Sequence, residues 1–126
     1  PNIIKAATDK PILAHVNWFQ RGDDGRFLWP GYRDNLRPLL WLLQLKAGEV
    51  KGVQTPVGIL PAKDELNLDG LEIDEADLDT VLSIDNARWI QEMGYRKEHL
   101  EQFPNMPDAI WEAHNRVAAA LEADAQ

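Results

Sequence analysis

The apolar positions of the chain follow two periods, a strand-like one near its beginning and a helical one over most of the rest. Residues 12–19 carry the apolar and aromatic side chains that strands favour, namely Ile12, Leu13, Val16, Trp18 and Phe19. The sequence Asp23-Asp24-Gly25 is a strong turn signal, and residues 26–29 can return in the antiparallel direction. This pattern predicts a β-hairpin that ends at Trp29-Pro30-Gly31.

Helical spacing begins after the hairpin, with leucines at positions 36, 39, 40 and 43. Asp34 or Asn35 can cap this helix, because both side chains accept hydrogen bonds from free backbone N–H groups. Pro38 falls in the first turn, where its missing N–H costs little. We expect the helix to end near Gly48.

Two aspartates predict the starts of two further helices. Asp74 can cap one of them, with Ile73 and Leu78 as a hydrophobic staple across the cap. Eleven residues later, Asp85 can cap the next helix in the same way, with Ile84 and Trp89 as the hydrophobic staple. A last helix is expected to begin near Pro107, with an apolar stripe formed by Ile110, His114, Val117 and Leu121.

These patterns together indicate an α+β fold in which an N-terminal β-hairpin is followed by about four helices. Residues 55–61 contain prolines and a glycine and are expected to be extended or edge structure, and residues 67–70 form a turn. No internal repeat, low-complexity segment or linker divides the chain. We therefore predict a single unit over 1–126, with strands and an aromatic loop in 12–35 and mostly helix in 36–126.

The charge of the chain is acidic overall but unevenly distributed. The net charge of −8 argues against general nucleic-acid binding, since affinity for the phosphate backbone comes from clustered Lys and Arg. Residues 1–52 carry eight basic and five acidic residues, and residues 53–126 carry five and sixteen. A basic segment beside an acidic one can attract a small anion, although a solvated acidic face is the simpler explanation of the sixteen acids.

Composition also indicates the cellular compartment of the protein. The chain has no cysteine, which excludes disulfides and thiolate metal sites and fits a reducing environment. No apolar run approaches the roughly 20 residues of a membrane span, and no signal-peptide pattern is present. We expect a soluble, cytoplasmic protein with no membrane partner.

The common catalytic motifs are missing. His15, His99 and His114 are too scattered to form a metal site on one helix face, and Ser83, the only serine, is not in a nucleophile-elbow setting. No glycine-rich phosphate loop and no dinucleotide fingerprint occurs. A faint calcium-loop pattern over 65–76 ends in Ala76, where a bidentate Glu is required. The sequence therefore supplies no catalytic residue of its own.

The remaining candidate is the segment 17–35, which we call the aromatic loop because it holds half of the aromatic residues of the chain. Phe19 and Phe27 can face each other across the hairpin, and Tyr32 can close over them after the Pro30-Gly31 bend. Such rings hold a planar base by stacking, and the amide of Asn35 could donate and accept at its edge. The alternative is that the aromatic residues are core and that Asn35 is a helix cap.

The order of residues in this segment resembles that of a known family. His15-Val16-Asn17-Trp18-Phe19, then Gly25-Arg26-Phe27-Leu28-Trp29-Pro30-Gly31, then Asn35 and Arg37, are similar to the C-terminal nucleotide-pocket segment of the GTP-dependent phosphoenolpyruvate carboxykinases. The similarity continues through Thr55-Pro56-Val57-Gly58, residues 66–71 and the helical stretch around Trp89.

The resemblance implies a role in a decarboxylating lyase of gluconeogenesis, which converts oxaloacetate and GTP to phosphoenolpyruvate, GDP and CO2 with Mn2+ or Mg2+. The chain would then be the C-terminal part of the nucleotide-binding lobe of a larger two-lobed α/β enzyme. Phe19 and Tyr32 would sandwich the guanine and Phe27 would press on it. Asn35, with the backbone from Tyr32 through Arg33 and Asp34, would read the edge of the base. Trp18 and Trp29 would support this pocket from behind.

The family's phosphate loop, metal ligands, oxaloacetate-binding arginines and lid lie upstream of the similar segment. The resemblance therefore implies that the remainder of a parent enzyme is the partner of this chain, and that the 126 residues alone are inactive. Exposed pocket residues would also promote dimerisation or aggregation of the isolated chain. The family usually has Phe at the position of Tyr32 and commonly Gly and Glu at those of Arg33 and Asp34. A second hypothesis is a non-catalytic interaction domain that uses the aromatic hairpin as its partner surface.

Overall fold

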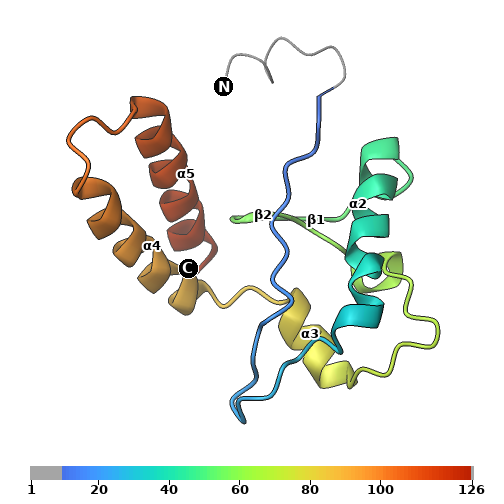
Figure 1. The fold of residues 1–126 in the computed structure, drawn as a ribbon. Helices are drawn as coiled ribbons and strands as arrows, with labels where there is room; N and C mark the ends of the chain where they lie inside the picture. Colours follow the sequence, from blue (N-terminus) through green and yellow to red (C-terminus); the bar gives the residue numbers. More distant parts are fainter. Residues whose placement is uncertain (1–9, 126) are drawn as a thin grey trace. The chain divides into compact units, whose positions relative to one another are not determined.

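A computed structural model describes residues 10–125, which group into two compact units. The first unit runs up to Val53 and then from Pro61 to Leu82, and the second comprises Gln54–Leu60 and residues from Ser83 onward. Figure 1 traces the elements in chain order. The single unit expected over 1–126 stays a prediction.

The first unit is built around helix α2, Leu36–Ala47, and helix α3, Glu75–Leu82. A 3-10 turn, η1 (Tyr32–Asp34), leads into α2, and a second one, η2 (Lys63–Glu65), precedes α3. The helix expected after Asn35 is confirmed, and it ends where predicted because Gly48 adopts the left-handed conformation (φ 77°) that closes helices. The expected turn over 67–70 also forms, since Leu71 N donates to Leu68 O at 3.0 Å.

The core of the first unit is a small apolar cluster of Trp41 from α2, Leu66 and Leu78 from α3. A ring of partly buried residues packs against it, namely Leu42, Leu45, Val50, Leu68, Ile73 and Leu82. The predicted staple residues Ile73 and Leu78 thus both belong to this cluster, and Asp74 Oδ1 accepts from Ala76 N at 2.9 Å at the start of α3. The capped helix predicted after Asp74 is confirmed.

The prediction of a strand over 12–19 is wrong. Residues 10–17 are irregular, and the expected hairpin is reduced to one antiparallel bridge between Arg21 and Phe27. The chain does reverse at the predicted Asp-Asp-Gly turn, where Gly22 N donates to Arg26 O and Leu28 N donates to Gln20 O, both at 3.0 Å. The strand fails because Asn17 Oδ1 captures the N–H of Phe19 in a local turn, and because Leu13 is largely exposed.

The β-hairpin of the described residues lies further along the chain, in strands β1 (Val53–Thr55) and β2 (Gly58–Leu60). The extended structure expected over 55–61 is confirmed as far as β2 is concerned. The order of elements differs from the prediction, because α2 precedes this hairpin instead of following it.

The second unit contains the two longest helices, α4 (Asn86–Glu101) and α5 (Asp108–Asp124). They run side by side in opposite directions, as Figure 1 shows. The predicted cap of α4 is present, since Asp85 Oδ1 accepts from Arg88 N at 3.0 Å, and α5 begins after Pro107 as expected. Met93 and Leu100 of α4, with His114 and Leu121 of α5, are buried.

None of the helices in residues 10–125 combines the length and the apolar character needed to cross a membrane.

Candidate functional site

Two phenylalanines of the aromatic loop lie in contact. The ring centroids of Phe19 and Phe27 are 5.9 Å apart with an interplanar angle of 67°, an edge-to-face contact. The guanidinium of Arg21 lies 4.0 Å from the centroid of Phe27 and covers one face of that ring. Phe19 nevertheless remains 73% exposed and Phe27 46% exposed. The predicted meeting of the two rings is observed, across the turn at 22–25.

Tyr32 stands apart from these two rings. It is 97% exposed at the start of η1, directly after Gly31, whose φ of 104° and ψ of −149° lie in a region almost restricted to glycine. The glycine therefore sets the direction in which the chain leaves the turn toward Tyr32. The closure of Tyr32 over a base stays a prediction.

The two tryptophans of the loop are less exposed than its other aromatic rings. Trp29 and the neighbouring Leu28 are buried, whereas Trp18 is only partly so. The indole nitrogens of Trp18 and Trp29 are both buried without a hydrogen-bond partner. The aromatic loop therefore contains both buried side chains and exposed rings, and the exposed rings do not serve as core.

Asn35 occupies the cap position of α2 without capping it. Its backbone is already helical (φ −63°, ψ −18°), and its side chain makes no cap hydrogen bond. Its Oδ1 is buried and has no partner. The alternative interpretation of Asn35 as a simple helix cap is therefore not supported, and a buried acceptor is left open for a donor.

The two residues before Asn35 differ in their surroundings. Asp34 Oδ1 accepts from Arg37 Nε at 2.8 Å in a pair whose side chains are both mostly buried. Arg33 is exposed. The carboxylate of Asp34 is therefore engaged by Arg37, whereas the side chain of Arg33 faces solvent.

Arg37 ties the end of the aromatic loop to the turn at 67–70. Besides Asp34, its guanidinium donates to the backbone oxygens of Asn67 and, at 2.9 Å, Asp69. These bonds hold η1 and the first turn of α2 against that turn.

Arg26 ties the other end of the loop to α3. Its Nη2 donates to Asp77 Oδ1 at 2.8 Å and its Nη1 to Asp77 Oδ2, a bidentate pair, while its Nε donates to Asp24 at 2.9 Å. Asp77 is only 8% exposed. Its carboxylate raises the pKa of Arg26, because it hydrogen-bonds and attracts the charged guanidinium. The sequence gives no sign of this pair, because the two residues lie 51 positions apart.

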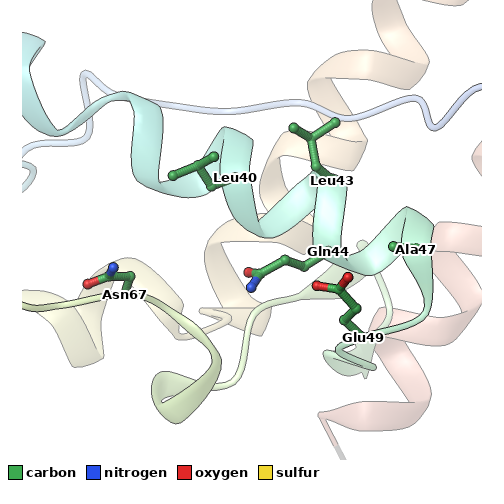
Figure 2. A pocket seen from close by; sticks show the side chains of 6 residues that line it. All are labelled: Leu40, Leu43, Gln44, Ala47, Glu49 and Asn67. Atoms are coloured by element: carbon green, nitrogen blue, oxygen red, sulfur yellow. The ribbon is translucent and has the colours of Figure 1, made fainter.

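Two surface hollows lie elsewhere on the described residues. One has a volume of about 370 Å³ and is lined by Leu40, Leu43, Gln44, Ala47, Glu49 and Asn67. Figure 2 shows Gln44 and Glu49 close together, with Asn67 on a separate segment at the left of the view. The other, of about 200 Å³, lies on α4 and α5 beside His114. Burial, with the nearby charges of Arg96 and Lys97, lowers the pKa of His114. Neither hollow includes a predicted site residue.

No three His, Asp or Glu side chains among residues 10–125 come together in a way that could hold a metal ion. The resemblance implies Mn2+ or Mg2+ in the parent enzyme with ligands outside this chain, and that expectation stays a prediction.

Comparison with known proteins identifies the family. Residues 2–120 match the phosphoenolpyruvate carboxykinase C-terminal P-loop domain. The chain is 37% identical over 102 residues to the phosphoenolpyruvate carboxykinase [GTP] of Thermoplasma volcanium, an alignment that covers 81% of this chain and 17% of that protein. It is 40% identical over 103 residues to the enzyme of the same name from Neocallimastix frontalis, covering 79% and 17%.

A third relative extends the match. The phosphoenolpyruvate carboxykinase [GTP] of Corynebacterium jeikeium is 34% identical over 120 residues, which is 94% of this chain and 20% of that protein. The chain spans about a fifth of the length of the curated relatives it matches. It belongs to the GTP-dependent phosphoenolpyruvate carboxykinase family, and it corresponds to part of the C-terminal P-loop domain.

Proposed function

We propose that this chain supplies the guanine-binding wall of a GTP-dependent phosphoenolpyruvate carboxykinase. The parent enzyme would convert oxaloacetate and GTP to phosphoenolpyruvate, GDP and CO2. The family match supports the reaction, and the aromatic loop supports the part that this segment plays in it.

The proposal rests on the exposure and the hydrogen bonding of three side chains in the aromatic loop. Phe19 and Phe27 touch while keeping exposed ring surface, and Asn35 Oδ1 is buried without a partner. Exposed rings lose contact with water when a base stacks on them, which is worth on the order of 1–3 kcal/mol per base. An open acceptor beside them would favour a base that presents donors at its edge.

These properties favour guanine over adenine. The edge of guanine presents two adjacent donors, N1–H and N2–H, whereas adenine presents a single donor, the N6 amino group, beside an acceptor at N1. Asn35 Oδ1 would accept from the guanine donors. The Asn35 amide nitrogen is itself a donor, so it is compatible with the acceptor O6 of guanine. Phe19 and Tyr32 would cover the two faces of the base, with Phe27 holding the ring of Phe19 in place.

The phosphate and metal chemistry would come from the rest of the parent enzyme. The sequence has no phosphate loop, and residues 10–125 form no metal cluster. We therefore propose that Mn2+ or Mg2+ binds ligands outside this chain, and that the 126 residues alone do not catalyse the reaction.

The test is nucleotide selectivity in the complete enzyme. Replacing Asn35 by Ala should lower the ratio of kcat/KM for GTP to that for ATP by about tenfold, which corresponds to one hydrogen bond of about 1.4 kcal/mol. Asn115→Ala, an exposed change on α5, is the matched control and should leave the ratio unchanged. An unaltered ratio in Asn35→Ala would remove Asn35 from the role of base reader.

A second measurement separates this proposal from the interaction-domain hypothesis, which the exposure of Phe19 and Tyr32 also favours. Phe19→Ala should raise the KM for GTP by about tenfold or more, because a stacking face is lost. If the KM for GTP stays constant while a protein partner is lost, the aromatic loop is a partner surface and the guanine-wall proposal fails.

A further inference from the structure

The aromatic loop is joined to α3 by one bidentate ion pair whose carboxylate is buried. Arg26 directly precedes Phe27 in the chain, and its guanidinium meets both oxygens of Asp77, a residue of α3. A buried carboxylate without a partner would be unfavourable. The Asp77 side chain is therefore held in place by its ion pair with Arg26.

The same arginine is fixed at its backbone. Arg26 N donates to Asp24 Oδ1 at 3.0 Å, and Arg26 O accepts from Gly22 N at 3.0 Å. Its Nε also donates to Asp24, so both the backbone and the side chain of Arg26 are hydrogen-bonded. Because Phe27 is the next residue in the chain, these bonds also restrict the position of its Cα.

We propose that Arg26 and Asp77 form a positioning pair, which fixes Phe27 and through it the stacking surface of the nucleotide site. This inference rests on the proposed function, since it concerns the stacking surface of the same site. Neither side chain need touch the nucleotide. Arg26 acts through the backbone that it shares with Phe27, and Asp77 acts by anchoring Arg26 to α3.

The proposal predicts a specific kinetic signature. Phe27 and Phe19 contribute stacking, which does not distinguish one purine from another, whereas edge reading belongs to Asn35. Loss of the pair should thus raise the KM for GTP and the KM for ATP by the same factor, about tenfold, and leave the GTP to ATP ratio unchanged. The kcat at saturating nucleotide should stay within about twofold, because the interaction lost is one of binding.

The experiment uses Arg26→Ala, Asp77→Asn and the double variant in the complete enzyme. Each single variant should raise both nucleotide KM values, and the double variant should add little to either, because both changes break one pair. Arg26→Lys should restore the KM only in part, since an ammonium cannot make the bidentate contact. Asp77→Asn keeps the shape of the buried side chain, so the test survives if Arg26→Ala does not fold.

Lys63→Ala is the matched control. Lys63 also pairs with α3, through Glu75 at 2.9 Å and Asp79 at 2.7 Å, but it does not belong to the aromatic loop. Its removal should leave both nucleotide KM values unchanged. If Lys63→Ala raises them as Arg26→Ala does, the effect comes from α3 in general and the positioning role of Arg26 is wrong.

Phe19→Ala distinguishes failure of this inference from failure of the proposed function. If Phe19→Ala raises the KM for GTP and the Arg26 and Asp77 variants do not, the positioning pair is refuted while the guanine wall stands. If neither Phe19→Ala nor the pair variants change the KM, the guanine wall itself is refuted and the pair has no role in nucleotide binding.

Discussion

Glu65 shows how one side chain can organise several segments. Its carboxylate accepts from the indole Nε1 of Trp41 and from the backbone N–H groups of Lys51 and Gly52, each at 3.0 Å, and more weakly from Ala62 N. These donors, first Lys51 and then Gly52 and Trp41, lower the pKa of Glu65 to about 2. A carboxylate that accepts several N–H bonds is favoured in its charged form.

The depressed pKa of Glu65 implies an acid-dependent loss of stability. The folded-state pKa of about 2 lies below the usual value of 4.5, so the unfolded chain binds the proton more readily. The stabilisation is therefore complete above about pH 4.5 and is lost as the pH falls toward 2. Urea unfolding should show Glu65→Gln to be less stable than the original chain at pH 7, with a difference that shrinks between pH 4.5 and 2.

The exposed residue Glu72 provides the comparison for that measurement. Glu72→Gln removes a carboxylate from the same unit without removing these hydrogen bonds, and it should leave the urea midpoint at pH 7 nearly unchanged. A constant difference between Glu65→Gln and the original chain across this pH range would contradict the proposed network.

Among single residues, those with local partners could be predicted from the sequence. Asp85 caps α4 by accepting from Arg88 N, three positions on, so its role can be predicted from the neighbouring residues. Asp77 and Glu65 were not predicted as anchors, because their partners lie far along the chain. The unpartnered amide of Asn35 could not be predicted either, since its surroundings look like those of an ordinary cap.

At the scale of elements, helices were predictable and the first strand was not. A helix closes its own hydrogen bonds, so local signals suffice: leucine spacing places α2, the Asp85 cap places α4, and Pro107 with an apolar stripe places α5. A strand needs a partner, and residues 12–19 find none among the described residues, although their composition is strand-like. The same limit explains why the pairing of β1 and β2 was seen only as extended structure.

The α4–α5 pair depends on a few buried side chains, of which Leu121 is the most enclosed, with 0% of its surface exposed. Leu121→Ala should lower the free energy of unfolding of the second unit by about 2–5 kcal/mol, because it removes apolar contacts and leaves a cavity. Ile110→Ala on the same helix, at a site 38% exposed, should cost less than about 1 kcal/mol. Urea unfolding followed by circular dichroism measures both, and equal costs would show that α5 is not packed as described.

At the scale of the whole molecule, helix α2 presents an exposed leucine surface. Four leucines on α2, at positions 36, 39, 40 and 43, are each at least 40% exposed. The chain corresponds to about a fifth of its relatives, so other parts of those proteins are available to cover such a surface. The family could be recognised from the sequence because its motif lies in the aromatic loop, whereas this leucine surface appeared there only as helical periodicity.

This surface makes the predicted self-association of the isolated chain testable. Leu39→Glu with Leu43→Glu should raise the dimer dissociation constant more than tenfold, because each buried leucine contributes about 1.5–3 kcal/mol and glutamate keeps a similar helix propensity. Asn115→Glu with Ala119→Glu adds the same charge to exposed positions on α5 and is the matched control. Sedimentation velocity over a concentration series measures the association.

If the α5 variant dissociates as readily as the α2 variant, net charge and not the leucine surface governs the self-association. If only the α2 variant becomes monomeric, the leucines of α2 form the contact between copies of the isolated chain.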